Sequence, residues 1–102
     1  MHPLIEQKLA DISSICRQHH VRQLEVFGSA ARGSDFDPAT SDADFLVEFV
    51  PGGRKGLDSY FGLKAALERL LQRNVDLVES GAVRNPYVMA DINREREIVY
   101  AA

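Results

Sequence analysis

The chain has 102 residues, 45% of them hydrophobic, and its 12 Lys and Arg against 15 Asp and Glu give a formal net charge of -3. This length supports one hydrophobic core, so we expect a single domain over residues 1–102. The acidic balance argues against a dedicated duplex-DNA or membrane-surface binder, which usually carries a basic excess. The single cysteine, Cys16, excludes an internal disulfide and a cysteine-ligated zinc or iron–sulfur site.

No membrane or targeting segment is expected. No apolar run approaches the roughly 20 residues that cross a bilayer. The N-terminus also lacks the basic start and the continuous apolar stretch of a signal peptide. We therefore expect a cytoplasmic protein without membrane contact.

The first two predicted elements are a helix and a strand. Apolar residues at helical spacing predict one amphipathic helix over residues 3–19, in which Cys16 is expected to be buried. Residues 22–27 are typical of a strand, with Leu24 and Val26 on one face. This strand ends directly before Gly28.

The second strand is predicted over residues 43–50. Its apolar face carries Phe45, Val47 and Phe49. The opposite face carries Asp42, Asp44, Leu46 and Glu48. A Pro-Gly-Gly sequence then ends the strand.

The C-terminal half is predicted to contain a helix, a short strand and a second helix. The spacing of leucines and Phe61 predicts an amphipathic helix over residues 57–71. Asn74 is expected to end it in a left-handed conformation. A short strand follows over residues 75–78, and residues 86–100 are expected to be helical, with Ile92, Ile98 and Val99 available for the core. Alternating helices and short strands indicate an α/β (α+β) domain with a small sheet, whose strand order the pattern does not reveal.

Gly28 and Ser29 form a candidate phosphate-binding turn. They follow a strand and precede a short predicted helix, where a glycine lets the backbone approach a ligand and a serine adds a hydroxyl donor. A tight turn with an ordinary serine cap would have the same sequence. No Gly-Lys-Ser/Thr follows, so the turn is not a Walker A loop.

Three aspartates form a candidate metal site. Asp42 and Asp44 are two residues apart on a predicted strand, so they point to the same face, about 6.7 Å apart along the chain. Hard carboxylate oxygens suit Mg²⁺ in phosphoryl-transfer sites, although an isolated pair of this kind is more often a solvated strand edge. Asp76 adds a carboxylate to an otherwise apolar strand, where burial without a partner would be costly.

The combination resembles a known family. GSAARG at residues 28–33, SDAD at residues 41–44 and VDLV at residues 75–78 are similar to the nucleotidyltransferase domain of the DNA polymerase β superfamily, and most of all to the minimal nucleotidyltransferases (MNT). The tail at residues 92–100 also looks like the family's C-terminal helix. The resemblance implies a polymerase β-like nucleotidyltransferase fold, in which helices flank a small mixed sheet.

The resemblance also implies roles for individual residues. Gly28 and Ser29 would hold the β- and γ-phosphates of ATP. Asp42 and Asp44 would bind Mg²⁺. Asp76 would complete the metal site and help to activate the attacking hydroxyl.

Arg32 has two interpretations. As part of the nucleotide site it would face a phosphate. It would otherwise brace the loop through ion pairs with Asp35 and Asp37.

The minimal family implies an antitoxin that transfers AMP from ATP to a tyrosine of a HEPN-domain ribonuclease toxin, with no stable nucleic-acid binding. Three alternatives remain: a binding-only antitoxin that masks its partner, a small-molecule nucleotidyltransferase, and a sensor that binds ATP without transfer. The intact site residues argue against pure masking. The absence of a second domain for an acceptor pocket argues against the small-molecule enzyme.

Overall fold

The computed structural model describes residues 2–32, 37, 42–51, 57–80, 90 and 96–102. In chain order, its elements are α1 (Pro3–Glu6), α2 (Leu9–Gln18), β1 (Val21–Phe27), α3 (Ser29–Arg32), β2 (Ala43–Phe49), α4 (Leu57–Leu71), β3 (Val75–Glu79) and β4 (Glu97–Ala101). The four strands form one sheet in the order β3-β2-β1-β4. No helix in the described residues is long and apolar enough to cross a membrane.

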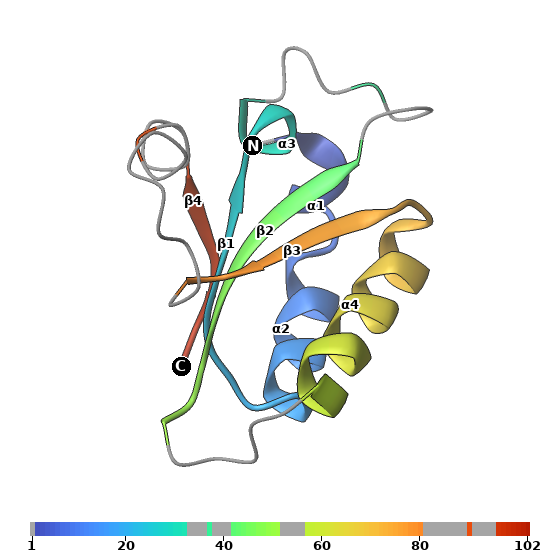
Figure 1. Cartoon of the computed structure of the whole chain (residues 1–102). Coiled ribbons are helices and arrows are strands. Elements are labelled where there is room, and N and C mark those ends of the chain that lie inside the picture. Colours follow the sequence, from blue (N-terminus) through green and yellow to red (C-terminus); the bar gives the residue numbers. More distant parts are fainter. Residues whose placement is uncertain (1, 33–36, 38–41, 52–56, 81–89, 91–95) are drawn as a thin grey trace.

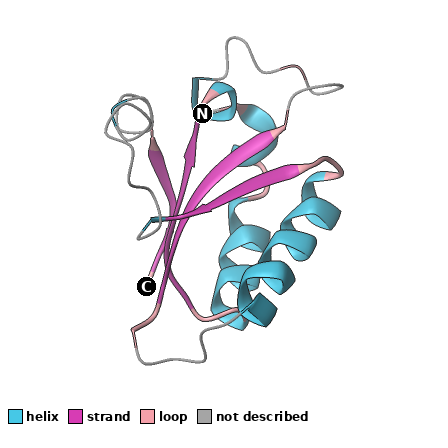
Figure 2. Cartoon of the chain, viewed as in Figure 1, coloured by secondary structure: helices cyan, strands magenta, loops and turns pink. Residues whose placement is uncertain are grey.

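The sheet is mixed, as expected. β1 pairs antiparallel with both β2 and β4, whereas β2 and β3 are parallel. Parallel neighbours need a crossover connection, and α4 lies between β2 and β3 in the chain. Helices α2 and α4 lie side by side on one face of the sheet (Figures 1 and 2). The opposite face carries no helix among the described residues and is termed the open face.

Strand alternation separates the two faces. Leu24 pairs with Val47 and Val26 with Phe45, and all four side chains are buried in the core. The intervening residues point to the open face, which carries the polar side chains of both strands. The predicted apolar faces of β1 and β2 are therefore confirmed, with Phe49 only partly buried at the end of β2.

The single helix predicted over residues 3–19 is wrong in one respect. A turn at Gln7 and Lys8 divides it into α1 and α2. His2 Nδ1 accepts a hydrogen bond from Leu4 N (3.1 Å) and so caps α1. Because buried apolar residues lie on both sides of the break, the apolar spacing alone does not reveal it. Cys16 is buried, as predicted, and burial raises the pKa of its thiol to about 12.

Helix α4 has the predicted bounds, and the predicted leucines Leu63, Leu67 and Leu71 are buried, but Phe61 and the residue that ends the helix differ from the prediction. Phe61 is 55% exposed, and Tyr60 packs against the core instead, with its hydroxyl donating to Leu77 O. The left-handed residue after the helix is Gln72 (φ 53°), not Asn74. Asn74 O already accepts from Ala43 N (3.1 Å), so this residue begins the pairing of β3 with β2.

The helix predicted over residues 86–100 is wrong at its C-terminal end. Residues 97–101 form the edge strand β4, in which Val99 is buried and Ile98 is 58% exposed. Consecutive β-branched and aromatic residues favour a strand here. The Arg- and Glu-rich segment that suggested a helix lies before the strand. Ile92 and the rest of residues 91–95 lie outside the described residues.

Replacement of Gln72 by glycine should stabilise the protein. A left-handed conformation costs an L-residue about 1–2 kcal/mol, part of which glycine loses again through chain entropy, so Gln72→Gly should raise the free energy of unfolding by about 0.5–1 kcal/mol. Urea denaturation measures this. The matched control, Gln18→Gly in the last turn of α2, should lower stability by about 0.5 kcal/mol; equal effects of both changes would contradict the prediction.

Candidate functional site

The turn after β1 packs against a carboxylate of β2. Gly28 follows β1 in a left-handed conformation (φ 68°), and its carbonyl accepts hydrogen bonds from Ala31 N and Arg32 N, both at 3.1 Å, as α3 begins. A Cβ at Gly28 would lie 2.5 Å from Asp44 Oδ2. Backbone angle and available space both exclude a larger residue, so Gly28 brings its backbone directly against the Asp44 carboxylate.

The N-terminal segment positions this turn. His2 N donates to Ala30 O (2.9 Å), and this bond joins the start of α1 to α3. Ile5 of α1 and both alanines of α3, Ala30 and Ala31, are buried in the core. The predicted short helix after Gly28 is therefore confirmed, and its position depends on the first residues of the chain.

Asp44 and Asp76 are brought together by strand pairing. They are register partners in the parallel ladder of β2 and β3, and Phe27 faces Asp44 from β1. Phe27, Asp44 and Asp76 thus form one row across three strands, termed the carboxylate row. Asp42 lies two residues before Asp44, so alternation places it on the same face. Both Asp42 and Asp76 are exposed, whereas Asp44 is half-buried.

The exposure of Asp76 corrects one step of the sequence argument. The sequence suggested a carboxylate inside a buried strand, which would need a partner to offset the cost of burial. β3 instead lies at the edge of the sheet, and Asp76 points to its open face. Its place in the carboxylate row, not its burial, is what links it to Asp44.

Asp44 has an unusual ionisation. Its pKa is raised from 3.8 to about 6, mainly because the carboxylate is desolvated and further because the charges of Asp76 and Asp42 repel it. The Arg32 guanidinium lowers the pKa in part. The charges of all three predicted aspartates and of Arg32 therefore act at one place, and the negative charge there is incompletely compensated.

The donor set fits a hard divalent cation bound together with a phosphate ligand. No three His, Cys, Asp or Glu side chains in the described part of the chain are gathered closely enough to hold a metal ion by themselves. Mg²⁺, however, usually binds through one or two carboxylates plus substrate phosphates. Asp44 with its neighbours provides such a set, and a cation would offset the repulsion that raises the pKa of Asp44.

Arg32 lies at the end of α3 and is exposed. Its charge acts on Asp44, which neither interpretation of the sequence included. Asp35, one of the two predicted loop partners, lies outside the described residues.

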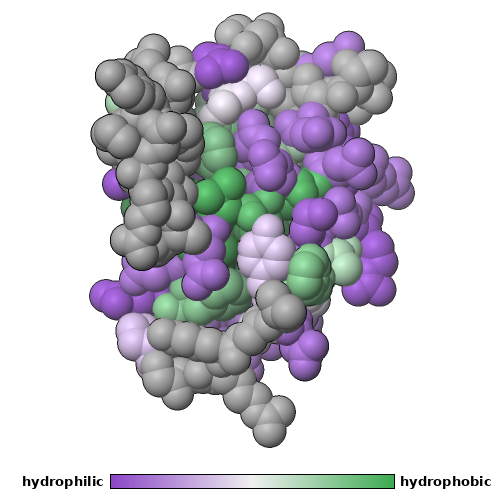
Figure 3. Space-filling model, in the orientation of Figure 1, coloured by the Kyte–Doolittle hydropathy of each residue, from purple (hydrophilic) through white to green (hydrophobic). Residues whose placement is uncertain are grey.

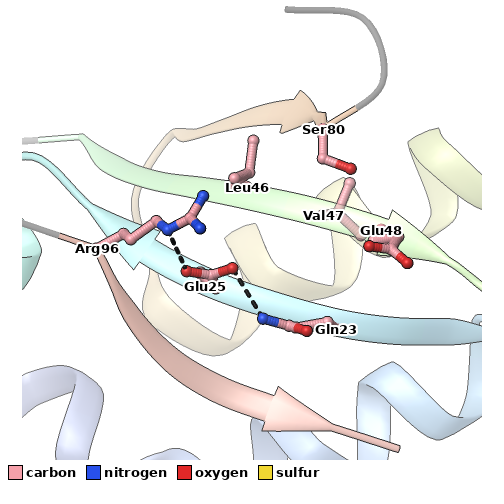
Figure 4. Close-up of a pocket in the computed structure, with 7 residues that line it drawn as sticks. All are labelled: Gln23, Glu25, Leu46, Val47, Glu48, Ser80 and Arg96. Carbon is pink, nitrogen blue, oxygen red and sulfur yellow. Dashed lines mark hydrogen bonds and ion pairs between the residues drawn. The ribbon is translucent and has the colours of Figure 1, made fainter. Parts of the chain in front are cut away.

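A second polar group on the open face was missed by the sequence analysis. Glu25 of β1 is only 8% exposed. Its Oε1 accepts from Gln23 Nε2 (2.8 Å), and its Oε2 is paired with Arg96 Nε (3.1 Å) (Figure 4). The sequence predicted a helix at Arg96, because nothing local showed that a strand, β4, would follow it and pair with β1.

The raised pKa of Asp44 predicts a stability change for Asp44→Asn. A folded pKa of about 6 against an ordinary 3.8 means that wild-type stability falls as pH rises through this interval. Asparagine avoids this loss, so without metal the variant should be more stable above pH 6 by about 1 kcal/mol, after discounting for the solvent that screens Asp44. The difference should disappear below about pH 4.

Thermal unfolding between pH 4 and 8 measures the effect, with Asp11→Asn in the first turn of α2 as the matched control. An Asp44→Asn variant that is no more stable than the wild type at pH 7 would contradict the raised pKa of Asp44.

Comparison with known proteins agrees with the predicted family. A family model described as a nucleotidyltransferase domain matches residues 9–99. A relative from Methanocaldococcus jannaschii, named as a candidate protein adenylyltransferase, is 33% identical over 100 residues, covering 90% of this chain and 96% of the relative. A second relative of that name and organism is 35% identical over 102 residues, with the same coverage.

Solved structures show the same fold. A candidate minimal nucleotidyltransferase superposes with a TM-score of 0.75 at 33% identity, covering 95% of both chains. A chain of a toxin–antitoxin complex with AMP-PNP gives a TM-score of 0.70 at 18% identity, over 92% of this chain and 73% of that one. A chain from the complex of a tri-AMPylated Shewanella oneidensis HEPN toxin with its MNT antitoxin gives 0.67 at 15% identity, over 96% and 73%.

The family match spans most of the chain, and the relatives are covered almost completely. The fold and the enzyme class expected from the sequence are therefore confirmed. This chain belongs to the nucleotidyltransferase domain family and resembles its minimal members.

Proposed function

We propose that this chain is a single-domain protein adenylyltransferase that moves AMP from ATP, with Mg²⁺, to a tyrosine of a HEPN-domain toxin and thereby acts as its antitoxin. The observation that carries the proposal is the contact between the Gly28 backbone and the Asp44 carboxylate. It brings a turn suited to phosphate next to carboxylates suited to a divalent metal, as nucleotidyl transfer requires.

Gly28 and Ser29 are proposed to hold the β- and γ-phosphates. The missing side chain at Gly28 lets the turn lie directly against the Asp44 carboxylate, and Ser29 offers a hydroxyl at the start of α3. Arg32 at the other end of α3 adds a positive charge that acts on Asp44. Together these groups would orient the triphosphate with its α-phosphorus over the carboxylate row.

Asp42, Asp44 and Asp76 are proposed to hold Mg²⁺. When bound, the metal would neutralise the phosphate charge and orient the reacting groups. Half-buried Asp44 is fixed by Gly28 and supplies the rigid ligand, whereas Asp42 and Asp76 are exposed and can adjust to the nucleotide.

The transfer step is an in-line displacement. The acceptor hydroxyl oxygen forms a bond to the α-phosphorus, and the bond from that phosphorus to the oxygen bridging to the β-phosphate breaks. Pyrophosphate leaves with the bonding electrons, and the hydroxyl proton passes to the Asp76 carboxylate and then to water. Asp76 is suited to this role because it is exposed on the open face beside Asp44.

The nature of the acceptor is supported by similarity. Relatives that this chain covers almost completely are named as candidate protein adenylyltransferases. A protein of the same fold is found in a complex with an AMPylated HEPN toxin. A protein acceptor also needs no second domain, since its own surface supplies the contacts that position the hydroxyl.

Label transfer tests the proposed reaction. The wild-type chain, incubated with Mg²⁺, α-labelled ATP and the HEPN-domain protein encoded beside it, should label that protein. Asp42→Asn and Asp44→Asn should each reduce the rate by about a hundredfold or more, because a charged ligand to the metal is lost. Both variants should remain folded by circular dichroism.

The alternatives give other results. A binding-only antitoxin would inhibit its partner equally well as wild type and as Asp44→Asn, without label. A nucleotide sensor would bind Mg·ATP and release no pyrophosphate. A small-molecule nucleotidyltransferase would label a small hydroxyl compound but not the protein.

A glycine substitution tests the phosphate turn independently of the acceptor. Gly28→Ala should weaken binding of Mg·AMP-PNP at least tenfold, because the added Cβ meets Asp44 Oδ2 and the left-handed backbone is strained. The matched control is Gly62→Ala in α4, where a Cβ would meet only the His19 ring, at 3.0 Å. Calorimetric titration measures both, and unchanged affinity in Gly28→Ala would remove this turn from the nucleotide site.

A further inference from the structure

On the side of the carboxylate row away from Gly28, the open face of the sheet carries two further rows of residues. Next along the strands come Glu25, paired with Leu46 on β2, and then Gln23, paired with Glu48. Same-face residues two apart in a strand are separated by about 6.7 Å, so these rows lie one and two steps from Asp44. The Gly28 turn and α3 lie on the other side of the carboxylate row, where β1 ends.

The two rows formed by Glu25 with Leu46 and by Gln23 with Glu48 line a pocket. A pocket of about 210 Å³ is lined by Gln23, Glu25, Leu46, Val47, Glu48, Ser80 and Arg96 (Figure 4). In the view of Figure 3, apolar residues gather at the centre of the molecule, with hydrophilic residues around them. Leu46 is nearly buried and lines the pocket among polar side chains.

Among the described residues, Arg96 is paired in this pocket through one nitrogen. Its Nε is paired with Glu25 Oε2, and a terminal nitrogen of its guanidinium points to the side where Leu46 lies (Figure 4). Both oxygens of Glu25 are engaged, by Gln23 and Arg96. Glu48 is paired with Arg22 at 3.3 Å. Counting the described residues, the pocket is therefore close to neutral, and the donors that they leave available are the outer edge of the Arg96 guanidinium and the hydroxyl of Ser80.

The direction of the reaction places the acceptor on this side. In an in-line displacement the attacking and leaving oxygens lie on opposite sides of the phosphorus. If the phosphates leave toward Gly28 and Ser29, the attacking hydroxyl approaches from the opposite side of the carboxylate row. That side holds the pocket.

We propose that this pocket is the acceptor subsite, in which the outer edge of the Arg96 guanidinium binds an oxygen of the polypeptide segment that carries the attacking hydroxyl. The inference rests on the proposed function and deepens it, because it names the surface that selects a protein acceptor. Glu25 acts as a positioning residue, since it fixes the planar guanidinium in one orientation before the acceptor arrives.

The ligand group is a carbonyl or carboxylate oxygen. A guanidinium donates two parallel hydrogen bonds to such a group, and a lysine cannot reproduce this geometry. Leu46 gives an apolar floor for the carbon atoms of the segment, and Ser80 can donate a further hydrogen bond. The pocket thus suits a stretch of polypeptide better than a free nucleotide, because the phosphates of a nucleotide are proposed to bind at Gly28 and Ser29, on the other side of the carboxylate row.

Steady-state kinetics with the HEPN-domain partner as acceptor test the proposal. Arg96→Gln should raise the KM for the partner about tenfold or more, the loss expected for a charge-assisted hydrogen bond. The kcat should change less than threefold, and the Kd for Mg·AMP-PNP should stay within twofold of wild type. The matched control is Arg69→Gln on α4, at the opposite face, which should alter none of the three.

Two further variants separate recognition from folding. Arg96→Gln leaves the Glu25 charge unpaired, so the double variant Glu25→Gln with Arg96→Gln removes both charges and should show the same KM defect in a stable protein. Arg96→Lys keeps the positive charge and should restore only part of the affinity. A full return to wild-type KM in Arg96→Lys would overturn the bidentate role.

Cross-linking provides a readout that does not need turnover. Ser80→Cys can carry a thiol-linked photo-cross-linker, because Cys16 is buried and its pKa of about 12 keeps the thiol unreactive. The pocket position should cross-link to the partner near its modified residue. Ser14→Cys on α2 is the matched control and should give no such product.

The outcomes separate the two hypotheses. Labelling of the partner with equal KM in Arg96→Gln and Arg69→Gln would overturn the subsite and leave the proposed function intact. Binding without labelling, weakened by Arg96→Gln and cross-linked through position 80, would overturn the transferase function and retain the docking surface. A wild-type chain that binds Mg·AMP-PNP but neither binds nor labels the partner would overturn the acceptor subsite.

Discussion

The site depends on one close contact, between a backbone without a side chain and a carboxylate on the neighbouring strand. Because it lacks a Cβ, Gly28 adopts its left-handed conformation without strain and approaches the Asp44 carboxylate closely. The turn precedes α3, and the carboxylate that it touches belongs to the residue of β2 that pairs with Asp76 of β3. The groups proposed to bind phosphate and metal therefore meet at this contact.

The two faces of the sheet contribute to stability in opposite directions. The face under α2 and α4 buries leucine, valine and phenylalanine side chains and supplies the stability of the fold. On the open face, partial burial and then the charges of Asp76 and Asp42 raise the pKa of Asp44, and this opposes folding at neutral pH. The fold tolerates this loss of stability, because the carboxylates lie on the open face and not in the core between the sheet and the helices.

Sequence reasoning found the local features and missed those that depend on distant pairing. Local sequence is enough to predict the strand that ends at Phe27, the turn at Gly28 and the placement of Asp42 and Asp44 on one face. Asp76 was placed correctly on a strand but with the wrong burial, because its exposure depends on β3 being an edge strand. The strand at residues 97–101 was predicted as helix, since its pairing with β1 lies more than seventy residues back in the chain. For the same reason the ion pair of Glu25 with Arg96 had no sequence signal.

The bond from His2 N to Ala30 O gives the first residues of the chain a role in the geometry of the site. In Figure 1 the N-terminus lies beside α3, close to the turn at Gly28, whereas the C-terminus lies toward the other end of the sheet. An affinity tag or fusion partner joined at the N-terminus would therefore press on the turn proposed to hold the phosphates. Joined after Ala102, the same addition would leave that turn undisturbed, so the C-terminus is the better attachment point for purification or immobilisation.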